Sequence, residues 1–169
     1  MAVNDIIFWI LAGGAIISAL LMVTRRSTIP SALMLVVTFC FLAALYLTLN
    51  AQFLAVVQVA VYAGAIMVLV VFVIMLLNIR NEQYSLTGNW KTLVGVLGVA
   101  AILAQIIALF VMASDKFPKQ MNAKSIELGT VESIGTKLYT SYAFPFEMAS
   151  IILIAAAVGA IVLAKKKLI

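Results

Sequence analysis

Five long, uninterrupted apolar runs dominate the sequence and dictate the solvent in which it folds. A helix needs roughly 20 apolar residues to cross a membrane. The runs cover residues 6–24, 30–49, 53–78, 93–113 and 144–164. They lack the period-two alternation of membrane-spanning strands, so we expect helices. The sequence therefore predicts an all-α integral membrane protein, with a single membrane domain over residues 1–169 and a polar loop over 114–142.

The composition excludes several other classes of protein. The chain of 169 residues is 66% hydrophobic and 10% charged, with a mean hydropathy of +1.22. A soluble domain averages about half apolar and a quarter charged residues. The net charge of +5 comes from residues that gather between and after the apolar runs. This distribution is typical of membrane topology, so we expect a lipid bilayer as partner and no nucleic acid.

The side chains needed for metal or redox chemistry are scarce. The sequence has no histidine and one cysteine, Cys40, which lies inside an apolar run. The six acidic residues are too scattered to form a carboxylate cluster, and no glycine-rich phosphate loop or paired-cysteine motif is present. We therefore expect no metal site, no bound cofactor and no catalytic centre in this chain.

Lysine and arginine residues predict the orientation in the membrane. If the N-terminus lies outside, the inner segments hold seven of the 11 positive residues, namely Arg25, Arg26, Arg80, Lys91, Lys165, Lys166 and Lys167. The remaining four lie in the loop 114–142. Because cytoplasmic segments carry an excess of positive charge, we predict an outside (periplasmic) N-terminus and an inside (cytoplasmic) C-terminus, with 114–142 as an outer loop. No basic residue precedes the first run, which argues against a cleaved signal peptide.

The third run, "VVQVAVYAGAIMVLVVFVIMLLN", carries polar residues that an anchoring helix does not need. On an α-helix Gln58 and Tyr62 share a face with Ala65, and Ala60 and Gly64 lie nearly opposite. A small-residue face suits close helix approach. An amide or phenol in hydrocarbon needs a hydrogen-bond partner. Two interpretations stay open for the polar pair: it joins two helices, or it lines a hydrated path.

Glu147, in "FPFEMAS", is the only acidic residue embedded in a run. Pro145 suits the first turn of a helix, and an acid in that turn is stabilised by the helix dipole. The alternative interpretation is a proton station, because ionisable groups inside membranes are usually functional.

Two segments, "VYAGAIMVL" in the third run and "PFEMASIILIAAAVGAIVLAKKK" at the end, resemble a known family. The chain is similar to the J subunit, or subunit 6, of respiratory complex I, the proton-translocating NADH:quinone oxidoreductase. The five-span layout and the long loop before the last span match as well, so the resemblance covers nearly the whole chain.

The resemblance implies a non-redox subunit of a bacterial inner (plasma) membrane complex, packed against subunits of the A, H and K types. FMN, the iron–sulfur clusters and quinone would be held elsewhere in the complex. It also implies a π-bulge around Tyr62–Ile66 whose conversion to α-helix rotates bulky side chains and opens or closes a water path. The residues implied in this proton path or switch are Gln58, Tyr62, Gly64, Ala65, Ile66, Met67 and Glu147.

One departure and several alternatives accompany this resemblance. Some bacterial relatives have a glutamate where this chain has Gln58, and an amide cannot serve as a titrating proton station. The rival interpretations are a subunit of a related cation/proton antiporter or membrane hydrogenase, and a purely structural scaffold. A plastid origin is a further alternative to the bacterial membrane.

Overall fold

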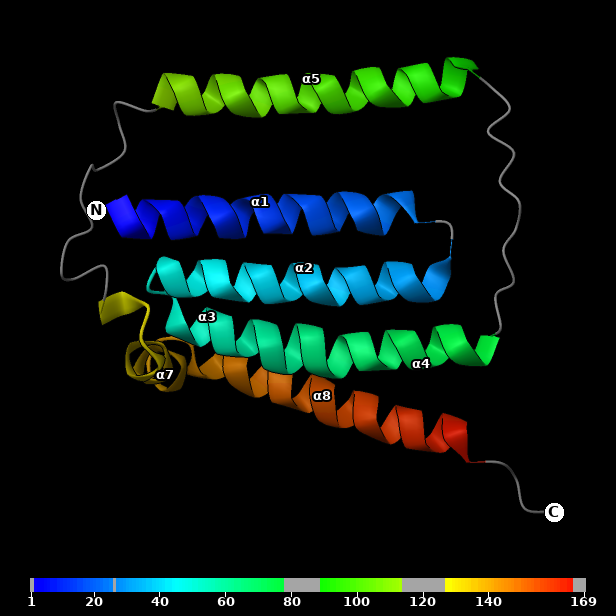
Figure 1. The fold of residues 1–169 in the computed structure, drawn as a ribbon. Coiled ribbons are helices and arrows are strands. Elements are labelled where there is room, and N and C mark those ends of the chain that lie inside the picture. Colours follow the sequence, from blue (N-terminus) through cyan, green and yellow to red (C-terminus); the bar gives the residue numbers. More distant parts are fainter. Residues whose placement is uncertain (1, 26, 78–88, 114–126, 166–169) are drawn as a thin grey trace.

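The regular structure of the described residues is helical throughout. The computed structural model describes residues 2–25, 27–77, 89–113 and 127–165. Its elements are α1 (Ala2–Thr24), α2 (Thr28–Thr48), α3 (Gln52–Val57), the π-helix η1 (Gln58–Ile66), α4 (Met67–Leu77), α5 (Asn89–Ala113), α7 (Val131–Tyr139) and α8 (Ala143–Ala164). The segments α3, η1 and α4 follow one another without a break and form one long rod (Figure 1).

Five helices in the described part are long and apolar enough to cross a membrane. They are Val3–Thr24, Thr28–Thr48, Gln52–Leu77, Leu93–Met112 and Ala143–Ala164. The predicted all-α fold with five spans is therefore confirmed, and the ends differ from those expected by at most three residues. Hydrophobic length alone fixes these elements, because lipid offers the backbone no hydrogen-bond partner outside a helix.

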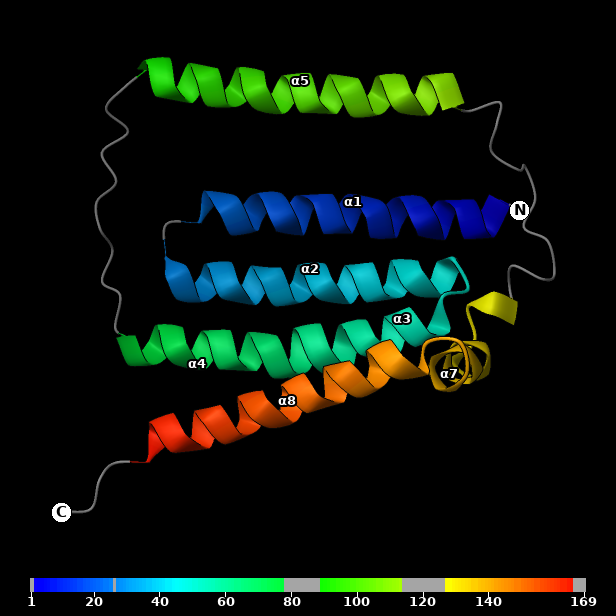
Figure 2. The ribbon, with the colours of Figure 1, turned by 180° about the vertical axis from the view of Figure 1, so that it is seen from behind.

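The packed core of the molecule lies between three spans. The helices α1 and α2 and the rod α3–η1–α4 lie side by side, with α2 in the middle (Figures 1 and 2). The buried residues are mostly small: Ala15, Ser18, Ala32, Thr38, Ala43, Ala55, Gln58 and Met67. Small side chains let helix backbones approach closely in a membrane, where dispersion contacts hold helices together. At Gly14 an added Cβ would lie only 2.6 Å from the ring of Phe41, so this glycine sets the spacing of α1 and α2.

The fourth and fifth spans leave their surfaces uncovered. In the described part of the chain, α5 packs against no other helix and α8 contacts only α7. None of the residues in the most apolar stretch of either span is buried. A five-span bundle that packed only on itself would bury a seam on each helix, so these two spans offer apolar faces to lipid and to other proteins.

Successive spans run in alternating directions. The N-terminus, the turn between α2 and α3, and the helix α7 lie at one end of the array, and the C-terminal end of α8 lies at the other (Figure 1). The predicted outer loop 114–142 is described only from residue 127 onward. Several charges that predicted the orientation lie outside the described residues: Arg26, Arg80, Lys116, Lys119, Lys124, Lys166 and Lys167. The side of the membrane thus stays a prediction.

Candidate functional site in the third span

The backbone of the third span changes its hydrogen-bond pattern inside the span. The amide of Gln58 reaches the carbonyls of Ala55 and Leu54, three and four residues earlier, and the second of these is the α-helical partner. The amide of Met67 reaches two carbonyls, that of Gly64 three residues earlier and that of Tyr62 five residues earlier, and the second of these is the π-helical partner. The π-helix Gln58–Ile66 encloses the segment in which a bulge was expected and begins four residues before it. Such segments are rare and occur frequently at functional sites.

The wider turns of η1 set which side chains meet α2. Gln58 and Met67 are both buried, with 7% and 2% of their surfaces exposed. In the described part of the chain, α2 is the only neighbouring span that packs against η1 and α4. In a regular α-helix, nine residues turn by about 900°, which would put these two side chains on opposite faces. A π-bulge accommodates one extra residue without the rotation of about 100° that this residue would add in an α-helix. The total turn falls to about 800°, which leaves the two side chains about 80° apart, so the π-helix lets both face α2.

Tyr62 lies at the edge of this contact rather than inside it. Its ring meets the ring of Phe39 on α2 edge-on, with centroids 5.7 Å apart and planes at 65°. Even so, 45% of Tyr62 is exposed. The shared polar face expected from the helical wheel is therefore divided. Gln58 is covered by α2. Tyr62 is exposed, as are Ala65 and Ile66, so this side of the helix is open to lipid or to a neighbouring protein.

Gly64 lies inside the π-helix, where a side chain would meet the backbone of the preceding turn. A Cβ at this position would lie 3.2 Å from the backbone oxygen of Val59, five residues earlier. Real Cβ atoms rarely approach a neighbour so closely, so a side chain here would press on the widened turn. The glycine therefore removes a steric barrier to a backbone that bonds five residues apart.

A buried hydrogen bond on the other side of α2 fixes that helix to α1. The Thr38 hydroxyl donates to the Ser18 hydroxyl oxygen over 2.9 Å, and Ser18 donates in turn to the carbonyl of Ala15 over 3.0 Å. Thr38 and Phe39 are consecutive, so α2 contacts α1 through one and η1 through the next. Sequence reasoning missed this contact, although hydroxyl residues within the first two apolar runs were a signal for it.

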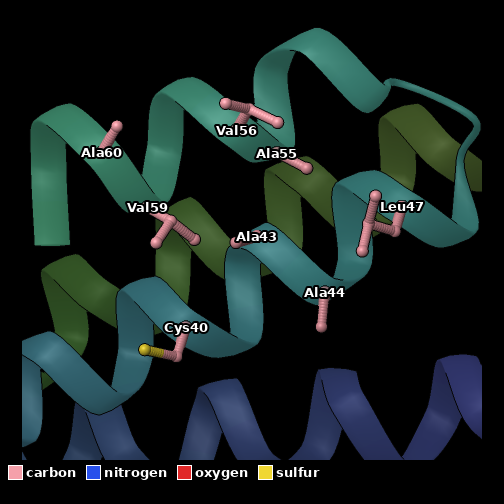
Figure 3. A pocket seen from close by; sticks show the side chains of 8 residues that line it. All are labelled: Cys40, Ala43, Ala44, Leu47, Ala55, Val56, Val59 and Ala60. Atoms are coloured by element: carbon pink, nitrogen blue, oxygen red, sulfur yellow. The ribbon is translucent and has the colours of Figure 1, made fainter.

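An apolar groove of about 500 Å³ opens between α2 and the start of the rod. Figure 3 shows its walls, formed by Cys40, Ala43, Ala44, Leu47, Ala55, Val56, Val59 and Ala60. Four of these residues are alanines, so the backbone lies near the groove surface. Walls of this kind suit an apolar helix of a neighbouring protein.

Glu147 lies apart from the π-helix. The helix α8, which carries it, does not pack against η1 in the described part of the chain. The first turn of α8 holds no acid, and Glu147 follows that turn as an exposed residue. The expectation that Glu147 sits in the first turn is therefore wrong, because α8 begins as early as Ala143, and the dipole effect falls off beyond that turn. The hydroxyl of Ser150 bonds to its own helix, to the carbonyls of Phe146 at 2.9 Å and Glu147 at 3.0 Å.

Comparison with known proteins identifies the family of this chain. The family model described as NADH-ubiquinone/plastoquinone oxidoreductase chain 6 matches residues 18–163. The chain belongs to this family. A relative from Synechocystis, the NAD(P)H-quinone oxidoreductase chain 6, is 37% identical over 99% of this chain and 83% of its own. The chloroplastic subunit 6 of Marchantia polymorpha is 34% identical over 96% and 89%, and the chain 6 of Nostoc is 36% identical over 98% and 81%.

Membership in the chain 6 family means that the span with the π-helix lies in a subunit of a larger complex. The chain is a membrane subunit of a complex I-type quinone oxidoreductase, and its partners include other subunits of that complex. The apolar spans and this membership agree on a multi-pass membrane protein. The resemblance seen in "VYAGAIMVL" is confirmed, and the antiporter alternative is not favoured.

Proposed function

We propose that the chain helps to couple quinone reduction to proton translocation by switching its third span between π-helical and α-helical hydrogen bonding. The observation that carries this proposal is the π-helix at Gln58–Ile66, in the middle of a span that packs on α2 alone among the spans the structure describes. A π-helix and an α-helix differ by small shifts of backbone partners, so one span can hold both forms without breaking.

The switch acts by rotating side chains about the rod. When the π-helix becomes α-helix, every residue after it turns by about 100° relative to Gln58. Met67 would then turn away from α2. Exposed side chains such as Ile66 and Leu69 would point in a different direction around the helix axis. Where the rotation replaces a bulky apolar side chain by a small one, space for water opens beside the span. The reverse rotation closes it.

Gln58 and Tyr62 supply the polar surface of this path. An amide and a phenol can each donate and accept a hydrogen bond, so they can hold waters without storing a charge. Tyr62 is half exposed and is held in place by Phe39, so its hydroxyl is available to waters or to a neighbouring subunit. The titrating groups of the path then belong to neighbouring subunits, because Gln58 cannot titrate.

The chain acts without a redox centre of its own. A sequence with no histidine and one cysteine cannot supply the thiolate and imidazole ligands that iron–sulfur clusters require. Flavin, iron–sulfur clusters and quinone are held by other subunits of the complex, and the chain meets the quinone only indirectly.

The neighbours in this proposal are the A-, H- and K-type membrane subunits, and the membrane is a bacterial inner membrane. The groove beside Cys40 and Val59 accepts an apolar helix from one of them, and the uncovered faces of α5 and α8 accept others. The positive residues keep the C-terminus inside.

The test is a pair of structures of the assembled complex, one at rest and one during turnover. The amide of Met67 should bond to the carbonyl of Tyr62 in one state and to the carbonyl of Ala63 in the other. The same amide partner in both states would refute the switch. If, in addition, replacing Gly64 and Tyr62 left pumping normal, the chain would be a structural scaffold.

A further inference from the structure

The third span begins in contact with a glycine that is distant in the sequence. The span starts at Gln52 in α3, and the amide of Phe53 donates a hydrogen bond to the carbonyl of Gly129 over 3.4 Å. The first four amides of a helix have no partner within the helix. Ala51, which precedes α3, has no polar side chain that could accept a bond from one of them. The carbonyl of Gly129 therefore takes the place of a capping side chain at the start of the third span.

The turn that leads into α3 leaves no room for a larger residue at position 129. A Cβ on Gly129 would collide with the carbonyl of Asn50 and would lie 3.3 Å from the Cα of Ala51. The turn itself is closed by hydrogen bonds. The amide of Asn50 donates to the carbonyl of Leu47 over 3.0 Å. The amide of Ala51 donates to the carbonyl of Tyr46 over 2.9 Å. Gly129 thus lies against a fixed piece of backbone, and only glycine permits this approach.

The segment that carries Gly129 is also fixed by hydrogen bonds. The amide of Thr130 donates to the carbonyl of Glu127 over 3.3 Å, and its hydroxyl donates to the same carbonyl over 2.8 Å. The hydroxyl oxygen of Thr130 accepts a bond from the amide of Ser133 over 3.3 Å and so caps α7. The helix α7 packs against both α3 and α8, at the end of the array where α2 turns into α3 (Figures 1 and 2). Gly129 is therefore held from both sides.

The two halves of the third span differ in how firmly they are held. The half before the π-helix, α3, contacts α2 and α7, and only the residues 49–51 separate it from α2. The half after it, α4, packs in the described part of the chain only on α2 and on η1, with which it is continuous. A rotation between the halves moves the one with fewer neighbours, because fewer contacts have to be broken. That half is α4.

We infer that Gly129 is a positioning residue for the switch proposed above, on which its role depends: it holds the start of the third span, so that conversion of η1 turns α4. If α3 were free to turn, the rotation of about 100° would be shared between the two halves. Met67 would then turn through a smaller angle, and the space for water beside the span would open incompletely. Quinone reduction would continue in other subunits, so fewer protons would be pumped per electron.

The first test uses the unaltered complex, in a pair of structures at rest and during turnover that are superposed on α1 and α2. The amide of Phe53 should stay bonded to the carbonyl of Gly129 in both states, while the amide of Met67 changes its partner. Loss of the bond between Phe53 and Gly129 in either state, with a changed partner of Met67, would overturn the inference and leave the switch standing. An unchanged partner of Met67 would refute the switch itself, and with it the positioning role of Gly129.

The second test compares two glycine variants of the assembled complex. Gly129→Ala forces the segment away from the carbonyl of Asn50. Gly135→Ala, within α7, is the matched control, because nothing in the described structure lies within 4 Å of a Cβ there. In Gly129→Ala the amide of Phe53 should exchange with heavy water about tenfold faster in the resting complex. The protons pumped per electron, measured in vesicles at equal assembly, should fall about twofold. Gly135→Ala should change neither quantity.

The number of protons per electron separates positioning from stability. A contact that only stabilised the fold would lower the amount of assembled complex and leave this number unchanged. A normal number of protons per electron in Gly129→Ala, with faster exchange at Phe53, would therefore overturn the inference. Unchanged exchange at Phe53 would overturn it as well, because the carbonyl of Gly129 would then not hold this amide. If Gly129→Ala prevents assembly, the two structures of the unaltered complex decide.

Discussion

The backbone oxygen of Val59 lies 3.2 Å from the position that a Cβ on Gly64 would occupy. This relationship makes Gly64 the residue whose size should govern the π-helix. Gly64→Ala presses on the widened turn and Gly64→Val presses harder, so both should favour the α-helical form. A penalty of about 1 kcal/mol would lower the population of the π-form roughly fivefold. We expect quinone reduction and proton pumping to fall together, with assembly intact.

Other glycines of the chain provide matched controls for this prediction. Gly98 on α5 and Gly159 on α8 also lie within spans, but nothing in the described structure lies within 4 Å of a Cβ at either position. Gly98→Ala and Gly159→Ala should leave quinone reduction unchanged, as measured in membranes with equal amounts of assembled complex. Equal losses at all three glycines would mean that Gly64 has no special role.

The hydroxyl and the ring of Tyr62 can be separated by two substitutions. Tyr62→Phe keeps the edge-on contact with Phe39 but removes the group that holds water. Tyr62→Leu also removes the contact, and an aromatic pair contributes about 0.5–1.5 kcal/mol beyond its area. Tyr62→Phe should therefore lower the protons pumped per electron, measured as acidification of vesicles, while the complex assembles normally. Normal pumping by Tyr62→Phe with a defective Tyr62→Leu would restrict the role of this residue to packing.

The hydrogen bond between Ser18 and Thr38 should contribute to stability and not to turnover. Thr38→Val and Ser18→Ala each remove it from the buried contact of α1 and α2. Hydrogen bonds between helices in membranes average about 0.6 kcal/mol, so the coupling found in a double-mutant cycle should be of that size. Thermal inactivation of the complex in detergent measures it. A fall in turnover per assembled complex would contradict this assignment.

The spans could be predicted from the sequence because a continuous apolar segment in lipid can pair its backbone N–H and C=O groups only by forming a helix. A run such as 53–78 has to be helical along its whole length, and its described residues form the continuous helix Gln52–Leu77. The neighbours of each span could not be predicted. Apart from Gln105, the span Leu93–Met112 of α5 is apolar on every side, and an apolar face that meets lipid is chemically the same as one that meets another subunit.

The site was predicted less well than the spans, for two physical reasons. The helical wheel put Gln58 and Tyr62 on one face, but Gln58 is buried and Tyr62 is at the edge of the contact, because a wheel gives the direction of a side chain and not how far a neighbouring helix covers it. The bulge itself came from the resemblance of "VYAGAIMVL" and not from any local preference of these residues. The helix α7 was missed because nine residues give a weak signal, although Thr130 and the spacing of Val131, Ile134 and Leu138 do mark it.

Glu147 should tolerate the loss of its charge. It is exposed on α8, beyond the first turn and away from the π-helix. Glu147→Gln keeps the shape of the side chain, so we expect normal assembly and at most about a twofold loss of quinone-linked pumping, since an exposed charge near a helix start contributes less than about 1 kcal/mol. Complete loss of pumping in a fully assembled complex would identify Glu147 as a proton station that serves a neighbouring subunit.

The orientation of the chain can be tested at described positions near the ends of the spans. In a Cys40→Ser background, Val3→Cys and Thr136→Cys should react with a membrane-impermeant maleimide added to sealed cells, because both lie at the end that is predicted to be outside. Arg25→Cys and Lys165→Cys, at the opposite end, should react only after the membrane is made permeable. Removal of one positive charge leaves six of seven on the inner side, which still exceeds the four in the outer loop, so neither variant should invert the chain. Labelling at position 165 from outside, with protection at position 3, would reverse the whole layout and place α7 on the cytoplasmic surface.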